Sequence, residues 1–293
     1  MFKVGLLFPG QGSQFPGMGK EVINDMPEAT KIMENANNIL GFDIGQIILN
    51  GDEELLKRTE IAQPAIFIVS AIHLAKLSKK QIRFDIVAGH SLGEYTALYA
   101  ACSLSFADGL NLVRKRGLLM ADTVGLPEGS MAAIMGLDIE TIRSIVGNYS
   151  QLCVANINSK SQIVVSGPIS SIDESLESFI EAGATKVIKL KVSGAFHSCL
   201  MNEAAQKLAE IIHITKFSEP KTPIIPNYSA AATADPEIIK ECLIKQMTNP
   251  VKWLDTIILM KELGVKEVYE VGPGEVLKRL VPTITTKIKC LSY

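Results

Sequence analysis

A serine lies between two glycines in the pattern Gly-x-Ser-x-Gly at residues 89–93. Apolar, strand-compatible residues precede it at 86–88, and helix-compatible residues follow at 94–101. A strand, a sharp turn and a helix with a serine at the apex form a nucleophile elbow, in which glycines permit the close approach of strand and helix. The hydroxyl of Ser91 would then stand at a helix N-terminus, where free N–H groups favour a developing oxyanion. The segment therefore predicts a serine nucleophile.

A serine nucleophile needs a base, and the chain has four histidines. His90 is next to Ser91, but neighbours across an elbow point apart, so we expect His90 to pack beneath the turn. His73 and His213 lie on expected helices and are interpreted as packed or surface side chains. His197 stands where a loop enters a helix. The residues alone leave two interpretations of His197 open, as the base or as an ordinary helix-entry side chain.

Clustered cations offer a further candidate. Arg116 belongs to the run Arg114–Arg116, which usually indicates a solvated helix face. A guanidinium near the serine would instead suit a carboxylate, because its fork binds both oxygens. Lys189 and Lys191 share one side of an expected strand. They are interpreted as an outward strand face, with a docking patch for an acidic partner as the alternative.

Composition describes an ordinary globular chain. Hydrophobic residues make up 47% and charged residues 20% of its 293 residues, and the net charge is −2. This balance provides no global basic field to attract nucleic acid or an anionic membrane. The first apolar run is too short for a signal peptide, and no run approaches the roughly 20 residues of a spanning helix. We therefore expect a cytoplasmic protein with neither nucleic-acid nor membrane partners.

The cysteines favour neither a disulfide framework nor a metal site. They are five, an odd number, and none forms a Cys-x-x-Cys pair. Cys199 lies two residues from His197, so a thiol role is an alternative. The preferred interpretation is that the cysteines are small buried or half-buried residues. No metal ligands are predicted.

The order of expected elements divides the chain in two. Over residues 127–192 the strands and helices follow the order β-α-β-β-α-β, which is typical of a ferredoxin-like module. Around it, over residues 1–126 and 193–293, strands alternate with helices and imply a mostly parallel sheet covered on both faces. The expected elements of this larger part include a strand at 4–8, mixed helical residues at 21–57, a turn at 59–64 with Pro64 starting a helix at 65–77, a strand at 223–227, helices at 236–247 and 251–263, and a last strand at 267–271.

Several short motifs occur together in one order. They are Phe8-Pro9-Gly10-Gln11-Gly12-Ser13-Gln14, Gln63-Pro64-Ala65, Gly89-His90-Ser91-Leu92-Gly93-Glu94, Arg116-Gly117, Phe196-His197-Ser198, and Gln246 with Asn249-Pro250-Val251. The set resembles the malonyl-CoA:acyl carrier protein transacylases of bacterial fatty acid synthesis and covers nearly the whole chain. The resemblance implies an α/β fold with an α/β-hydrolase-like core and an inserted ferredoxin-like subdomain, in agreement with the boundaries above.

The resemblance also implies catalytic roles. Ser91 would be the nucleophile, and His197 its general base and later its general acid. The backbone N–H groups of Gln11 and Leu92 would form the oxyanion hole. In this family a carbonyl at the position of Gln246, rather than an acidic residue, orients the histidine. This suits a sequence in which no aspartate stands out for the task.

Substrates follow from the same resemblance. Arg116 would pair with the free carboxylate of malonyl-CoA, and Phe196 resembles the residue of malonyl-selective acyltransferases. The malonyl group would pass to the phosphopantetheine of an acyl carrier protein, with no cofactor bound permanently and the enzyme a monomer. A free-standing acyltransferase serving a polyketide synthase is the alternative. A serine hydrolase and a non-catalytic carrier-binding protein are less favoured, because Arg116 argues against the first and the presence of nucleophile and base against the second.

Overall fold

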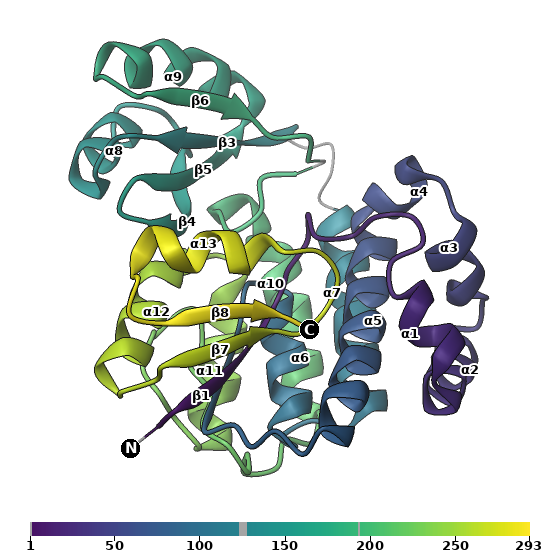
Figure 1. The fold of residues 1–293 in the computed structure, drawn as a ribbon. Helices are drawn as coiled ribbons and strands as arrows, with labels where there is room; N and C mark the ends of the chain where they lie inside the picture. The colour runs from purple at the N-terminus through teal and green to yellow at the C-terminus, as the bar shows by residue number, and fades with distance from the viewer. Residues whose placement is uncertain (1, 123–127, 193) are drawn as a thin grey trace.

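The structure, a computed structural model, describes residues 2–122, 128–192 and 194–293. In the described chain two four-stranded sheets lie one above the other in the view of Figure 1. The sheet in the larger of the two parts of the chain, called the larger sheet below, is parallel, with strand order β2-β1-β7-β8. Its strands are β1 (Val4–Phe8), β2 (Ile86–Gly89), β7 (Glu267–Glu270) and β8 (Lys289–Ser292). The mixed α/β fold class expected from the sequence is confirmed.

The larger sheet is covered on both faces. Along β1, Leu6 and Phe8 pack into one core with the helices α5 (Thr59–Lys79), α6 (Gly93–Ala100) and α7 (Phe106–Asp122). Leu7 points to the other face, where it packs with residues of α12 (Trp253–Glu262) and α13 (Val276–Ile284). Because alternate strand residues face opposite sides, burial on both faces requires the continuous apolar run that β1 shows.

The smaller sheet is antiparallel, with strand order β4-β5-β3-β6. Its elements are β3 (Gly129–Met135), α8 (Ile139–Val146), β4 (Cys153–Ser159), β5 (Gln162–Pro168), α9 (Ile169–Glu181) and β6 (Lys186–Lys189). Its helix-covered face has a core of its own, which includes Ile134, Ile142 and Phe179. The β-α-β-β-α-β pattern is therefore present. The proposed boundaries at 126/127 and 192/193 fall at residues outside the described ranges.

One short ladder fixes the smaller sheet to the rest of the chain. The Val251 N–H donates to the Ala155 carbonyl, and the Ile157 N–H donates to the Val251 carbonyl, each over 2.9 Å. Both Ala155 and Ile157 belong to β4. The edge of the smaller sheet is thus held by backbone hydrogen bonds directly before α12 begins.

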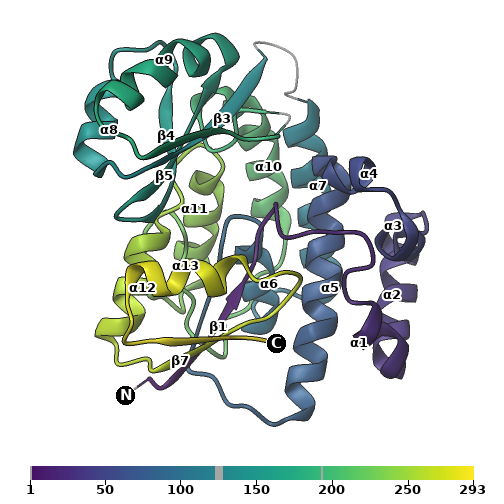
Figure 2. The same cartoon turned by 45° about the horizontal axis from the view of Figure 1, so that its top comes forward.

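Helices between β1 and β2 form a layer beside the large sheet (Figure 2). They are α1 (Lys20–Asp25), α2 (Pro27–Leu40), α3 (Ile44–Asn50), α4 (Glu53–Lys57) and α5. α2 ends at Gly41, which has a φ of 76°, a conformation that glycine adopts without steric cost. By length and composition α5 alone among the described helices could span a membrane, and 72% of its apolar window is buried inside the protein. Such burial is that of a core helix.

The expected turn at 59–64 is wrong, because α5 already begins at Thr59 and includes Pro64. A proline inside a helix has no N–H to donate to the carbonyl four residues earlier. Here that carbonyl belongs to Glu60, and it accepts a 2.7 Å hydrogen bond from Nη1 of Arg114 on α7. A side chain from a neighbouring helix therefore replaces the missing hydrogen bond, so the helix continues through the proline.

Two other expectations also need correction. The expected strand at 223–227 is reduced to a parallel bridge between Ile224 and Val87. Pro223 and Pro226 flank this bridge and lack the N–H donors that a longer ladder needs. In addition, Glu267–Glu270 is not the last strand, since α13 and β8 follow it and β8 pairs in parallel with β7.

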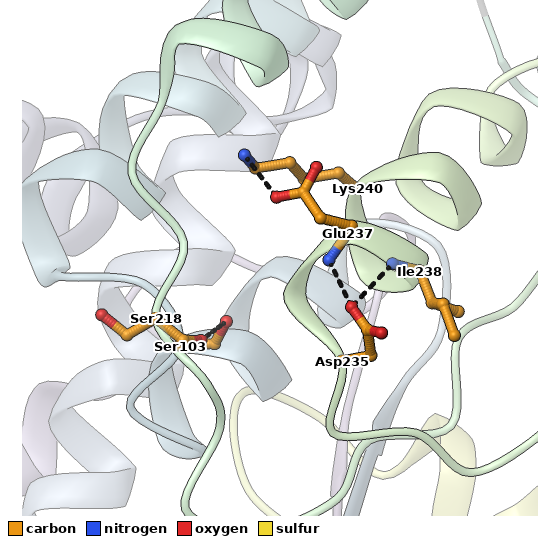
Figure 3. Close-up of polar contacts among 6 residues, drawn as sticks. All are labelled: Ser103, Ser218, Asp235, Glu237, Ile238 and Lys240. Carbon is orange, nitrogen blue, oxygen red and sulfur yellow. Dashed lines mark hydrogen bonds and ion pairs between the residues drawn. The ribbon is translucent and has the colours of Figure 1, made fainter.

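Three helical elements that follow the smaller sheet lead to a residue of the site at the end of the third. They are the short 3₁₀ helix η1 (Cys199–Met201), α10 (Asn202–Ile214) and α11 (Pro236–Gln246). Asp235 caps α11 by accepting from the N–H groups of Glu237 and Ile238, at 2.8 and 3.4 Å (Figure 3). Figure 3 also shows the Ser103 hydroxyl donating to the Ser218 carbonyl over 2.8 Å. The Asp235 cap fixes the start of α11, whose last residue is Gln246.

Candidate active site

The turn between β2 and α6 is a nucleophile elbow. Ser91 at its apex has a φ of 50°, in the left-handed region that side chains rarely adopt. A Cβ on Gly89 would lie 1.9 Å from the carbonyl carbon of Gly93, and a Cβ on Gly93 would lie 2.0 Å from the oxygen of Phe8. Both positions therefore require glycine, and the expected strand-turn-helix is present.

The structure brings His197 to this serine. Oγ of Ser91 lies 2.8 Å from Nε2 of His197, and Nδ1 of His197 lies 2.8 Å from the main-chain oxygen of Gln246. Burial and, to a smaller extent, the Arg116 charge lower the pKa of His197 to about 3. The neutral ring that results donates from Nδ1 to the carbonyl and leaves Nε2 to accept the serine proton. The arrangement has the geometry of a nucleophile with its base, oriented by a neutral acceptor.

Arg116 is buried beside the serine, so its interpretation as part of a solvated face is wrong. Its side chain is 1% exposed. Nη1 donates to Oε1 of Gln63 over 2.8 Å, while Nη2 donates to Oγ of Ser91 over 3.0 Å and to Oε1 of Gln246 over 3.2 Å. All three acceptors are neutral. A buried guanidinium without a directly bonded carboxylate has unused capacity to bind an anion.

Gln11 lies in the loop after β1, and Leu92 lies in the elbow after β2, the strand that pairs with β1. Gln11 follows β1 in a turn, where Gly12 has a φ of 102°, and Leu92 follows Ser91 directly. Within the described chain, neither backbone N–H donates to a protein acceptor. Gln11 and Ser91 line the same cavity. Two free N–H groups near a nucleophile are what an oxyanion hole requires.

A cavity of about 580 Å³ lies over the serine. Its apolar wall comes mainly from the smaller sheet and the segment after it, including Met131, Val164, Leu190 and Phe196. Cations from three different segments also line it, namely Lys57, Lys191 and Arg279. Lys191 lies beyond the end of β6, whereas Lys189 forms a 2.6 Å ion pair with Asp173. The paired interpretation of these two lysines as one strand face therefore does not hold.

Glu94 and Asn227 are site residues to which the sequence pattern gave no role. Oδ1 of Asn227 accepts from the N–H of Ser91 over 2.7 Å, and its Nδ2 donates to the Gly89 carbonyl over 2.7 Å. Glu94 is fully buried beneath the elbow, and burial raises its pKa to about 7. A charged residue five positions after the end of an apolar strand, on a helix whose other residues are uncharged, is the one signal that could have indicated Glu94.

The other histidines have other partners. Nε2 of His90 lies 2.9 Å from Oδ1 of Asn158 on the smaller sheet, and its ring packs on Trp253 with centroids 5.4 Å apart. Nδ1 of His73 lies 2.7 Å from the main-chain oxygen of Tyr293. His213 is exposed near the end of α10. Among the described residues none of these three histidines forms a hydrogen bond with Ser91, whereas His197 does.

The cysteines are free, and their expected burial is only partly correct. Cys102 and Cys199 are exposed, whereas Cys242 is buried. Cys102 has a φ of 61° at the turn that ends α6, which places its side chain outside the helix packing. In the described ranges no group of three or more His, Cys, Asp or Glu side chains could hold a metal ion.

Comparison with known proteins identifies the family. The model of the acyl transferase domain matches residues 6–286. A malonyl CoA-acyl carrier protein transacylase of Bacillus subtilis is 41% identical over 298 residues, covering 100% of this chain and 93% of the relative. A transacylase of the same name from Staphylococcus aureus is 39% identical over 296 residues, covering 100% of this chain and 96% of the relative.

Solved structures support the same family assignment. An acyl-carrier-protein S-malonyltransferase from Bartonella henselae superposes with a TM-score of 0.96 at 35% identity, covering 99% of this chain and 95% of the other. A malonyl-transacylase solved with its type II polyketide synthase acyl-carrier protein has a TM-score of 0.96 at 32% identity, covering 99% of this chain and 96% of the other. The chain is an acyltransferase that belongs to the family of malonyl-CoA:acyl carrier protein transacylases.

Proposed function

We propose that the protein transfers the malonyl group of malonyl-CoA to the phosphopantetheine thiol of an acyl carrier protein through a malonyl ester on Ser91. The contact that carries the proposal is the 3.0 Å hydrogen bond from the buried Arg116 guanidinium to the Ser91 hydroxyl. A cation this close to the nucleophile suits an acyl group that ends in a carboxylate. The names of the relatives support the same reaction.

In the first half-reaction Ser91 attacks the thioester carbonyl of malonyl-CoA. Its proton passes to Nε2 of His197, which already lies 2.8 Å away. The carbonyl oxygen gains negative charge, which the free N–H groups of Gln11 and Leu92 stabilise. When the tetrahedral intermediate collapses, the carbon–sulfur bond breaks and the CoA thiolate leaves with the proton from His197. The enzyme then carries a malonyl ester.

In the second half-reaction the phosphopantetheine thiol gives its proton to His197 and attacks the ester. The bond to Oγ of Ser91 breaks, and His197 returns the proton to the serine. The main-chain oxygen of Gln246 accepts from Nδ1 throughout and stabilises the imidazolium that forms in each half. The proposed chemistry uses side chains and two substrates, and it needs no permanently bound cofactor.

Arg116 gives the proposed selectivity. Its guanidinium can exchange the weak donor contact to Ser91 for a charged contact to the malonyl carboxylate, which is roughly twice as strong. An acetyl group has no such oxygen and leaves the guanidinium with neutral acceptors only. Sites built to bind a polar group reject analogues that lack it. Phe196 lines the same cavity and would limit the space beside the malonyl carbon.

We infer fatty acid elongation as the setting, with a monomeric enzyme in the cytoplasm that binds neither nucleic acid nor membrane. Two relatives at 41% and 39% identity carry the name malonyl CoA-acyl carrier protein transacylase. One observation favours a second setting, because the structure solved with a type II polyketide synthase carrier protein superposes equally well. Transfer rates to the two kinds of carrier would separate the settings.

Isotope exchange tests the proposed reaction. Labelled CoA incubated with malonyl-CoA and enzyme, without any carrier protein, is expected to enter the malonyl-CoA pool, because the first half-reaction is reversible. Ser91→Ala is the matched control and should show no exchange. Release of free malonate at a rate equal to or above exchange would indicate a serine hydrolase instead.

A further inference from the structure

Glu94 is a buried carboxylate that the proposed transfer does not use. It lies in the first turn of α6 and is fully shielded from solvent. Its Oε2 accepts from the Asn227 backbone N–H over 2.9 Å and from Nε2 of Gln246 over 2.7 Å. Both donors are buried. Without this oxygen the Asn227 N–H would lose its acceptor, while Nε2 of Gln246 would keep only its contacts with the Ser91 main-chain oxygen and Oδ1 of Asn227, at 3.0 and 3.4 Å.

The two residues that Glu94 holds are those that fix the reacting groups. Asn227 accepts from the Ser91 N–H over 2.7 Å. Gln246 accepts from His197 through its main-chain oxygen over 2.8 Å, and from Arg116 through Oε1 over 3.2 Å. Oε2 of Glu94 is therefore connected to Ser91 through Asn227, and to both His197 and Arg116 through Gln246. Each connection consists of two hydrogen bonds.

The second carboxylate oxygen, Oε1, has no hydrogen-bond partner. The contacts therefore demand one acceptor oxygen and no donor from this side chain. A glutamine can present the same acceptor oxygen in the same place, whereas an alanine cannot. This difference separates a role in holding Asn227 and Gln246 from a role that needs the negative charge.

We propose that Glu94 is a positioning residue, whose single accepting oxygen aligns Ser91, His197 and Arg116 through Asn227 and Gln246. The inference rests on the proposed function, because its effect is on malonyl transfer from CoA. Glu94 does not touch the reacting atoms. Without Glu94, we expect the side chains of His197 and Ser91 to be held less precisely. A displacement of about 1 Å at a reacting centre lowers the rate on the order of 100-fold.

The test measures steady-state kcat and KM for malonyl-CoA, with a carrier protein as acceptor, for Glu94→Ala and Glu94→Gln, together with the thermal midpoint of each variant. Glu94→Ala is expected to lower kcat about 100-fold with KM changed less than about threefold, because alignment acts on the transition state. Glu94→Gln should recover kcat to within about fivefold. A folded Glu94→Gln as slow as Glu94→Ala would overturn the proposal, as would a folded Glu94→Ala with wild-type kcat.

A double-mutant cycle shows whether the effect passes through Gln246. In a Gln246→Ala background Glu94→Ala should cost less than it does in the wild type, because only the route through Asn227 to Ser91 remains. Full additivity would contradict the proposal. Because Glu94→Gln keeps the volume and the acceptor, the proposal stays testable if Glu94→Ala fails to fold.

Glu270 provides a matched control. It is also fully buried, and it also accepts two N–H groups, those of Leu277 and Lys278 at 3.0 and 2.8 Å, but it does not contact the elbow. Glu270→Ala is expected to lower the thermal midpoint and leave kcat within about threefold. A wild-type enzyme that formed no malonyl adduct would refute the proposed function, whereas an active wild type with an equally active Glu94→Ala would refute this inference alone.

Discussion

The two walls of the cavity over Ser91 are built differently. One wall, with Ser91 on the elbow, Arg116 on α7, His197 before η1 and Gln246 at the end of α11, is a network of buried polar groups joined by hydrogen bonds of 2.8–3.2 Å. The wall from the smaller sheet and the segment after it combines apolar side chains, among them Met131, Val164 and Leu190, with the neutral amides of Asn156, Asn158 and Gln162. Chemistry depends on distances and proton positions, whereas enclosure depends only on apolar area. Substitutions in the first wall should therefore affect rate, and those in the second should affect binding.

The largest effect is expected for His197→Ala. Loss of the base leaves the Ser91 hydroxyl protonated, and the rate constant for acylation should fall by about 10⁴-fold. Rapid-quench measurement of the malonyl-enzyme gives this rate constant directly. A fall of less than tenfold would show that the polar wall is not the catalytic one.

Arg116→Ala is expected to change selectivity more than rate. The ratio of kcat/KM for malonyl-CoA over acetyl-CoA should fall by at least about 100-fold, since the variant keeps the nucleophile but loses the carboxylate contact. Competition between the two donors in one reaction measures the ratio. An unchanged ratio in a folded variant would remove Arg116 from substrate recognition.

The dependence of kcat/KM on pH tests the state of His197. Burial and the Arg116 charge lower the pKa of His197 from its ordinary 6.5 to about 3. The base therefore stays neutral as the pH falls through 6.5, and protonation removes it only when the pH approaches the lowered value. We expect an acid limb for kcat/KM with malonyl-CoA clearly below pH 6. If kcat/KM instead fell with an apparent pKa of 6.5 or above, His197 would be exposed to solvent in the enzyme.

Val164→Ala, in the apolar wall, should give the smallest effect. The side chain lines the cavity from β5 and is 5% exposed. Its truncation should raise KM for malonyl-CoA by about threefold and leave kcat unchanged, because the reacting groups lie on the other wall. A tenfold loss of kcat would show that the smaller sheet also aligns the chemistry.

Local pattern was sufficient to predict the elbow, the alternation of elements and the insert, because glycine spacing and apolar periodicity act within a few residues. The continuation of α5 through Pro64 was not predictable in this way, since it depends on Arg114 reaching Glu60 from another helix. Asn227 was missed for the same reason. Its side chain bonds Ser91, which is 136 residues away in sequence. Burial of Arg116 against Gln63 likewise arises only from helix packing.

The central claim is that Ser91 carries a malonyl group on its way to a carrier protein. The most direct measurement is the intact mass of the protein after brief mixing with malonyl-CoA, and again after addition of phosphopantetheinylated carrier. We predict one malonyl adduct, absent in Ser91→Ala, that moves to the carrier. An adduct that decays to free malonate without loading the carrier, or an adduct that persists in Ser91→Ala, would contradict it.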